Sequence, residues 1–340
     1  MIIDMHAHFL PRAFVSAASK GKPWYGWELL RNAEGQEFLL VEERGFPLPP
    51  GCEISDPEER HRLRKSSQGV DMEALIVIAY MWNYHLETKD SIAACREVNE
   101  ELGDLQKSYP DHYRGLAVLP MQDPVAAVKE MERSVKDLGL KSFAIGASIN
   151  GKNLDDPTVL PILEQAAEAG VTLSVHPPMW ARAGEHRFPR YYFANSFGAP
   201  LESSLAAMSV IYSGLLDRYP ELKLFFSQAG GWVNYGVGRF TLRYYQREDA
   251  RPMAEPPENY LGRMYFDCLI HDPESLKLLV SRVGADHVVI GTDFPAGGDI
   301  PVEGGAPRWI QDQDFLTGEE KDLILYKNAA GFLGLGDVAG

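Results

Sequence analysis

The chain has 340 residues, 45% of them hydrophobic and 24% charged, which is typical of a soluble protein built as one large α/β barrel or two smaller domains. Its net charge of −15 argues against binding to nucleic acid or to anionic membranes, which require basic surfaces. Cys52, Cys95 and Cys268 form no C-x-x-C pair, so we expect neither disulfides nor a thiolate metal site, and a cytoplasmic location. The N-terminus predicts no signal peptide, and no segment predicts a transmembrane span.

Short apolar runs alternate with helical patterns along most of the chain. The runs predict strands at Ile2–His6, Ala74–Tyr80, Gly115–Met121, Ser142–Ala147, Thr172–Pro177, Lys223–Gln228, Met264–Ile270 and His287–Asp293. Apolar residues at i, i+3 and i+4 predict helices at Thr88–Tyr109, Pro124–Leu138, Pro157–Ala169, Pro200–Tyr219 and Pro273–Val283. Asp123, Asp156 and Asp272 each precede a proline, which predicts three helix N-caps.

Eight strands separated by helices predict a (β/α)8 TIM-like barrel, formed by residues 1–340 as a single domain. A doubly wound open sheet is the alternative, which the absence of a glycine-rich phosphate loop after the first strand weakens. Residues 9–69 show no clear β/α unit and contain Trp24 and a possible hairpin around Ala33–Gly35. A loop of this length predicts an insertion or lid after the first strand. Residues 178–199 form a second irregular segment, which is aromatic and basic.

Three of the predicted strands end in residues that can bind a metal. His6 and His8 are two positions apart on the first strand, so both side chains point to the same face. His176 ends the fifth strand and Asp293 ends the eighth. Because strand ends meet at the active face of a barrel, these four residues predict a mononuclear site for zinc, or for manganese or iron.

These ligands resemble those of the amidohydrolase superfamily, and more narrowly its branch of aminocarboxymuconate-semialdehyde decarboxylase and related nonoxidative decarboxylases. The resemblance covers nearly the whole chain, including Gly115–Gln122, Ala127–Arg133, Val237–Arg239, Tyr260–Gly262, His271–Pro273 and Asn328–Leu335. It implies a TIM-like barrel, one divalent metal ion, commonly zinc, and a homodimer. It also implies that Arg239 binds a substrate carboxylate, across the dimer interface in the family decarboxylase.

The chain departs from the family pattern in three places. Gln228 stands where the family has a histidine that acts as general base, and a glutamine cannot take up a proton at neutral pH. Gln228 can still orient a water or polarise a carbonyl, so the base would be Asp293, a metal-bound hydroxide or a histidine such as His186. The stretch 47–50 replaces a substrate-binding arginine of the first loop, and residues 66–68 replace a Glu-Met-Asp sequence.

The first functional hypothesis is a metal-dependent nonoxidative decarboxylase of an aromatic or unsaturated ring-cleavage carboxylic acid. Arg239 would orient a carboxylate, and Trp24, Trp180 and Tyr191 would stack on the flat substrate. The second is a metal-dependent hydrolase or hydratase that acts on a C–N or C=C centre of a related intermediate of aromatic catabolism, with Asp293 as proton shuttle. A third is a barrel without activity, because fold alone does not determine function.

Overall fold

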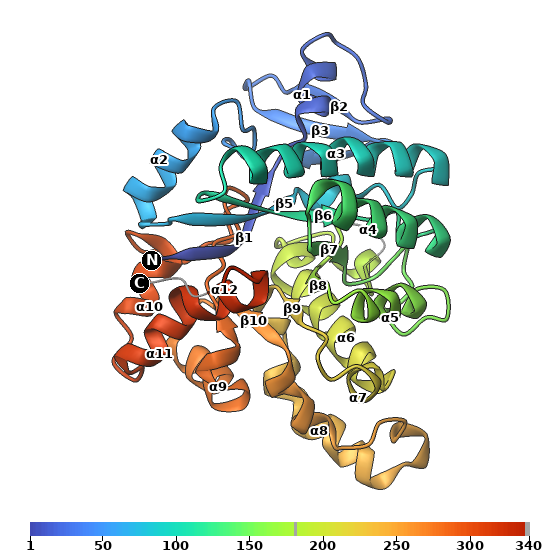
Figure 1. Cartoon of the computed structure of the whole chain (residues 1–340), viewed down its shortest axis with the longest axis vertical. Coiled ribbons are helices and arrows are strands. Elements are labelled where there is room, and N and C mark those ends of the chain that lie inside the picture. Colours follow the sequence, from blue (N-terminus) through green and yellow to red (C-terminus); the bar gives the residue numbers. More distant parts are fainter. Residues whose placement is uncertain (180–181, 337–340) are drawn as a thin grey trace.

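The computed structural model describes residues 1–179 and 182–336, and its centre is an eight-stranded parallel barrel surrounded by helices (Figure 1). The sheet order is β1-β5-β6-β7-β8-β9-β10-β11, so neighbouring strands of the barrel follow one another along the chain. The strands are β1 (Ile3–Phe9), β5 (Met72–Val77), β6 (Tyr113–Val118), β7 (Ser142–Gly146), β8 (Thr172–His176), β9 (Leu224–Phe226), β10 (Tyr265–Asp267) and β11 (Val288–Val289). The predicted barrel and its eight strands are confirmed.

The barrel closes where the segment after β11 meets β1. The Met5 amide donates to the Ile290 carbonyl at 2.9 Å, and the His8 amide donates to the Phe294 carbonyl at 2.6 Å. Because these bonds continue past the short strand β11, they bring the residues that follow it beside the two histidines of β1. The doubly wound open sheet is therefore wrong.

The helices are α1 (Arg12–Ala18), α2 (Pro57–Gln68), α3 (Thr88–Ser108), α4 (Pro124–Leu138), α5 (Leu160–Glu168), α6 (Ala199–Tyr212), α7 (Leu215–Arg218), α8 (Val233–Gln246), α9 (Pro273–Val283), α10 (Gly305–Gln311), α11 (Gly318–Asp322) and α12 (Asn328–Leu333). Asp123 and Asp272 cap α4 and α9 as predicted, accepting bonds from the Ala126 and Ser275 amides. The predicted cap at Asp156 is wrong, because its carboxylate bonds to Thr158 and α5 begins at Leu160. The predicted helix 200–219 is broken at Gly214, whose φ is 68°.

The segment between β1 and β5 contains α1, a three-stranded antiparallel sheet and α2. The sheet consists of β2 (Glu28–Arg31), β3 (Glu37–Val41) and β4 (Arg44–Pro47), and the turn between β2 and β3 confirms the predicted hairpin. Helix α2 lies against the barrel through two buried arginines, Arg60 and Arg64. Among the described residues, no helix combines the length and apolarity needed to cross a membrane.

Candidate metal centre

The four predicted metal ligands come together at the C-terminal end of the barrel. One ligand atom from each of His6, His8, His176 and Asp293 lies within 4.8 Å of the others. The Nε2 atoms of His6 and His8 are 3.2 Å apart, and Asp293 Oδ1 lies 3.3 Å and 3.0 Å from them. A tetrahedral zinc site with bonds of about 2.0–2.1 Å has ligands about 3.3 Å apart. The residues therefore fit one divalent cation.

Hydrogen bonds on the outer side of the imidazole rings fix two of the histidines. The Nδ1 of His6 donates to Asp267 Oδ2 at 2.9 Å, and the Nδ1 of His176 donates to the Pro177 carbonyl at 2.8 Å. Metal-binding histidines usually donate their second ring N–H in this way, which sets the tautomer and the ring orientation. The Nε2 of each ring is thereby left to face a cation.

The charges of the cluster also favour a cation. Burial would raise the pKa of Asp293, but hydrogen bonds and charge interactions with His6 and His8 hold it well below its ordinary value. Burial lowers the pKa of His8 and of His176, so both rings are neutral and have a lone pair to offer. Burial opposes protonation of His6 as well, but its bonds to Asp267 and Asp293 raise its pKa to about 10. A proton and a metal cation therefore compete for the Nε2 atom of His6, because its Nδ1 is already bonded to Asp267.

Asp267 was missed in the sequence, although it organises this centre. It ends β10, is fully buried, and accepts hydrogen bonds from His6 and from the amides of Gln228 and Ala229 at 3.0 Å and 2.7 Å. Gln228 and Ala229 both have positive φ, 56° and 52°, a conformation that non-glycine residues rarely adopt. Asp267 thus holds both a metal ligand and the strained turn that carries Gln228. An acidic residue inside a predicted buried strand was the sequence feature that could have revealed it.

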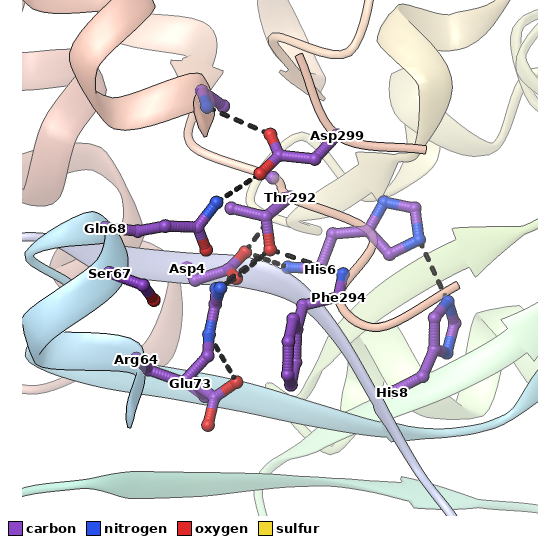
Figure 2. Close-up of polar contacts among 12 residues, drawn as sticks. Asp4, His6, His8, Arg64, Ser67, Gln68, Glu73, Thr292, Phe294 and Asp299 are labelled. Atoms are coloured by element: carbon purple, nitrogen blue, oxygen red, sulfur yellow. Dashed lines mark hydrogen bonds and ion pairs between the residues drawn. The ribbon is translucent and has the colours of Figure 1, made fainter. Parts of the chain in front are cut away.

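A network of buried charged residues next to His6 and Asp293 holds the segments that carry these two candidate ligands (Figure 2). Asp4 accepts hydrogen bonds from the His6 amide at 3.0 Å and the Thr292 amide at 3.1 Å, so it joins β1 to the residue before Asp293. Arg64 donates to Asp4 Oδ2 at 2.5 Å, to Thr292 Oγ1 at 2.9 Å and to Glu73 at 3.1 Å. Burial raises the pKa of Asp4 to about 6, which the positive charge of Arg64 opposes. Through Arg64, helix α2 therefore contacts both β1, which carries His6 and His8, and the segment that carries Asp293.

The end of α2 makes a second connection to the loop after Asp293. The side-chain amide of Gln68 donates to Asp299 (Figure 2). Asp299 also accepts bonds from the Ile300 and Ala306 amides at 2.7 Å and 2.9 Å. Ser67 points back into its own helix and donates to the Leu63 carbonyl at 2.7 Å. Gln68 thus connects α2 to the loop after Asp293, at the place where the resemblance implies a Glu-Met-Asp sequence.

A cavity of about 280 Å³ opens beside the metal ligands. Its described lining residues are Asn195, Ser196, Pro200, Gln228, Gly231, Trp232, Leu269, Ile270, His271, Asp293 and Gly298. A cavity of roughly 150 Å³ accepts benzene, so this one has room for a small aromatic acid. The Oε1 of Gln228 is buried and has no hydrogen-bond partner among the described residues. Gln228 can therefore accept a hydrogen bond from a ligand or water.

The structure does not bring all the predicted substrate-binding residues to this cavity. Trp24 is only 5% exposed and packs in the core, with its indole N–H donated to Glu97 at 2.8 Å, and it is not part of the described lining of the cavity, so substrate stacking by Trp24 stays a prediction. Tyr191 is 78% exposed, and His186 is also exposed; neither belongs to the described lining of the cavity. Arg239 is exposed on α8, and Trp180 lies outside the described residues.

The close approach of Gly298 to Asp293 gives a first testable expectation. A Cβ atom at position 298 would overlap Asp293 Oδ2, so Gly298→Ala must displace the carboxylate. We expect a loss of divalent-metal affinity of about 10- to 100-fold, the range seen when a metal ligand loses its support. Equilibrium dialysis with manganese measures this, and Gly331→Ala is the control because a Cβ there meets open space. Unchanged affinity in Gly298→Ala would show that Asp293 is not held in this position for the metal.

Comparisons with known proteins agree with this geometry. The family model described as amidohydrolase matches residues 3–335. A 2-amino-3-carboxymuconate-6-semialdehyde decarboxylase from Dictyostelium discoideum is 31% identical over 337 residues, which cover 98% of this chain and 91% of the relative. The crystal structure of 5-carboxyvanillate decarboxylase from Sphingomonas paucimobilis has a TM-score of 0.81 at 20% identity, with 98% of each chain covered.

A dihydroxybenzoic acid decarboxylase from Polaromonas, crystallised with manganese, has a TM-score of 0.77 at 20% identity, with 99% of this chain and 98% of that chain covered. At this identity the two crystal structures establish the shared fold, while the family model spans nearly the entire sequence. The chain therefore belongs to the amidohydrolase family.

Proposed function

We propose that this protein is a metal-dependent nonoxidative decarboxylase of an aromatic or unsaturated ring-cleavage carboxylic acid. The observation that carries the proposal is the complete set of four ligand side chains at a cavity of ring size, in a chain 31% identical to a decarboxylase along nearly its whole length. A bound divalent cation would hold the substrate carboxylate and a neighbouring oxygen and would stabilise negative charge that develops during the reaction.

A decarboxylation also needs a group that delivers a proton to the substrate, and the residues that line the cavity limit which group this is. When carbon dioxide leaves, the electron pair of the broken C–C bond stays on the substrate, and that carbon must then receive a proton. Among the described lining residues, the titratable side chains are His271 and Asp293. Asp293 holds its charge at neutral pH, because its pKa is well below the ordinary value. Proton delivery then falls to His271 or to water, while Gln228 orients the substrate or a water by hydrogen bonding.

Gln228 is also the observation that favours the second candidate function. Its neutral amide cannot replace the histidine that the family resemblance implies as base in decarboxylation, so a hydrolase or hydratase on a C–N or C=C centre, with water as the attacking group, is the alternative. Four supported ligand positions weigh against the third hypothesis, a barrel without activity.

We further propose that the metal ion is zinc or manganese and that the chain forms a homodimer in the cytoplasm. Helix α8 projects away from the barrel (Figure 1), and several large apolar residues at its start and along it are exposed: Trp232, Tyr235, Phe240, Leu242 and Tyr245. Exposed apolar faces of this kind commonly mark protein interfaces. Trp232 also lines the cavity, so a second copy on this face would border the cavity mouth, and Arg239 could bind the partner's substrate as the family resemblance implies. The three free cysteines are buried and unpaired, which suits a reducing compartment.

The proposed reaction is tested by following carbon dioxide. We expect the zinc- or manganese-loaded protein to release carbon dioxide from at least one acid in a panel of hydroxybenzoates and muconate-type acids, and chelator-treated protein to release none. Headspace mass spectrometry measures the gas, and mass spectrometry of the remaining acid detects any addition of water. Ammonia release or a mass gain of one water without carbon dioxide would refute decarboxylation in favour of the alternative.

A further inference from the structure

His271 places an imidazole in the wall of the metal-site cavity. The residue follows β10, and its φ of 59° is a left-handed conformation that residues other than glycine rarely adopt. Its Nε2 lies 2.7 Å from the Gly298 carbonyl oxygen, and His271, Gly298 and Asp293 all belong to the described lining of the cavity. Gly298 also lies against the carboxylate of Asp293, because a Cβ atom at position 298 would overlap it. A single residue, Gly298, therefore contacts both the imidazole and a candidate metal ligand.

The hydrogen bond to Gly298 determines which ring nitrogen of His271 can transfer a proton. A carbonyl oxygen only accepts, so Nε2 carries a hydrogen atom whether the ring is neutral or protonated. The proton that a histidine gains and loses is then the one on Nδ1. Because His271 is exposed to solvent, water can return this proton after each transfer.

The other polar side chains of the described lining cannot take this role. Besides His271 and Asp293 they are Asn195, Ser196, Gln228 and Trp232. Amide, hydroxyl and indole groups donate hydrogen bonds but keep their protons at neutral pH. Burial opposes ionisation of Asp293, but its bonds to two imidazoles hold its pKa well below the ordinary value, so it has no proton to give. Among the described lining residues, His271 is the one that can both release and regain a proton at neutral pH.

We infer that His271 is the catalytic acid that delivers the Nδ1 proton to the substrate carbon from which carbon dioxide departs. The inference rests on the proposed function and chooses this histidine over water as the proton donor. In net terms, the C–C bond breaks and its electron pair remains with the substrate, while the Nδ1–H bond of the imidazolium breaks and a C–H bond forms. Neutral His271 then regains a proton from water. A positioned general acid of this kind accelerates a reaction by about 100- to 10,000-fold.

The test follows the proton and uses the phenols that hydroxybenzoates give on decarboxylation. The manganese-loaded protein is incubated in deuterium oxide with phenol, catechol or resorcinol, and proton NMR measures deuterium uptake at the ring carbons. We expect wild-type protein to catalyse exchange into at least one of them, because His271 can give a deuteron to the carbon and take a proton from it without any carbon dioxide. His271→Gln is expected to lower the exchange rate by at least about 100-fold, since its amide can still donate to Gly298 but has no transferable proton. His112→Gln is the matched control, because His112 directly precedes β6, at the opposite end of the barrel from the metal ligands.

Two further measurements separate proton transfer from support of the metal centre through Gly298. Manganese affinity, measured by dialysis, is expected to be unchanged in His271→Gln. Imidazole added to His271→Ala is expected to restore part of the exchange, because a free imidazole can enter the space that the ring leaves at the cavity wall. A fall in metal affinity that accounts for the lost exchange would overturn the inference, since His271 would then act only by holding the loop of Asp293.

Absence of exchange with wild-type protein, or equal exchange by wild-type protein and His271→Gln, would also overturn the inference. Thermal unfolding shows whether each variant is folded, and the glutamine variant keeps the comparison valid if the alanine variant is not. The exchange needs no decarboxylation, so exchange by a protein that releases no carbon dioxide from any acid would refute the proposed reaction and leave His271 as a proton donor to carbon. Carbon dioxide release at equal rates by wild-type protein and His271→Gln would overturn the inference and leave the proposed reaction standing.

Discussion

Asp293→Asn is expected to lower divalent-metal affinity by more than about 100-fold, the upper end of what loss of an outer partner of a ligand costs. The carboxylate oxygen Oδ1 lies within 3.3 Å of both His6 Nε2 and His8 Nε2, so this one atom faces the same point as two imidazoles. An asparagine keeps the shape but removes the negative charge and presents N–H donors on one side. Decarboxylase activity should be lost with the metal.

The fall in metal affinity is measured by dialysing the protein against a fixed free manganese concentration. Inductively coupled plasma mass spectrometry then gives the metal content of the protein. The variant should also lose the stabilisation that bound metal gives wild-type protein, about 2.7 kcal/mol when free metal is 100-fold above its Kd. Asp155→Asn is the control, because Asp155 is exposed and distant in sequence from every ligand. If Asp293→Asn binds metal as tightly as wild-type protein, Asp293 is not a ligand.

Arg64→Met is expected to destabilise the protein by about 3–5 kcal/mol, because it leaves the buried carboxylate of Asp4 without its ion-pair partner. A methionine side chain is similar in length to arginine and leaves little empty space. The loss of stability therefore measures mainly the missing charge and hydrogen bonds of Arg64. Asp4 and Thr292 bridge β1 and the segment that carries Asp293, so we also expect metal affinity to fall by about 10- to 100-fold.

Urea unfolding and manganese dialysis measure the two effects on the same preparation. Arg62→Met on the same helix is the matched control, since Arg62 is exposed and surface substitutions usually change stability by less than about 0.5 kcal/mol. Conversely, a loss below about 1 kcal/mol with unchanged metal affinity would mean that α2 does not support the metal centre. Arg64→Lys separates the two contributions, because an ammonium can pair with Asp4 but cannot also reach Thr292 and Glu73 with a planar fork.

The barrel and the convergence of His6, His8, His176 and Asp293 could be predicted because they follow from local patterns. Buried parallel strands are short apolar runs, and two histidines at i and i+2 on a strand share a face. The convergence of His176 and Asp293 with this pair required only that the strands form a barrel, whose C-terminal strand ends meet. Closure through Met5 and His8 then places Asp293 beside the histidines, as the fold requires.

Helix α2 could not be predicted from apolar periodicity, because the residues it buries are Arg60 and Arg64. Their burial depends on partners that are distant in the sequence, Asp4 and Glu73, which only the folded chain brings near. The same limit explains Asp267, whose role becomes visible only when His6 and the turn at Gln228 surround it. The burial of Trp24 could not be predicted either, because an aromatic residue in an irregular loop can belong to the core, where Glu97 accepts its indole N–H.

The central claim, that His6, His8, His176 and Asp293 together hold one divalent cation, is tested most directly by anomalous diffraction from manganese-loaded crystals. We predict one strong anomalous peak per chain, bonded to the Nε2 atoms of the three histidines and to Asp293, at the edge of the cavity that contains Gln228. No peak at this position, or a peak bound by other residues, would contradict the claim.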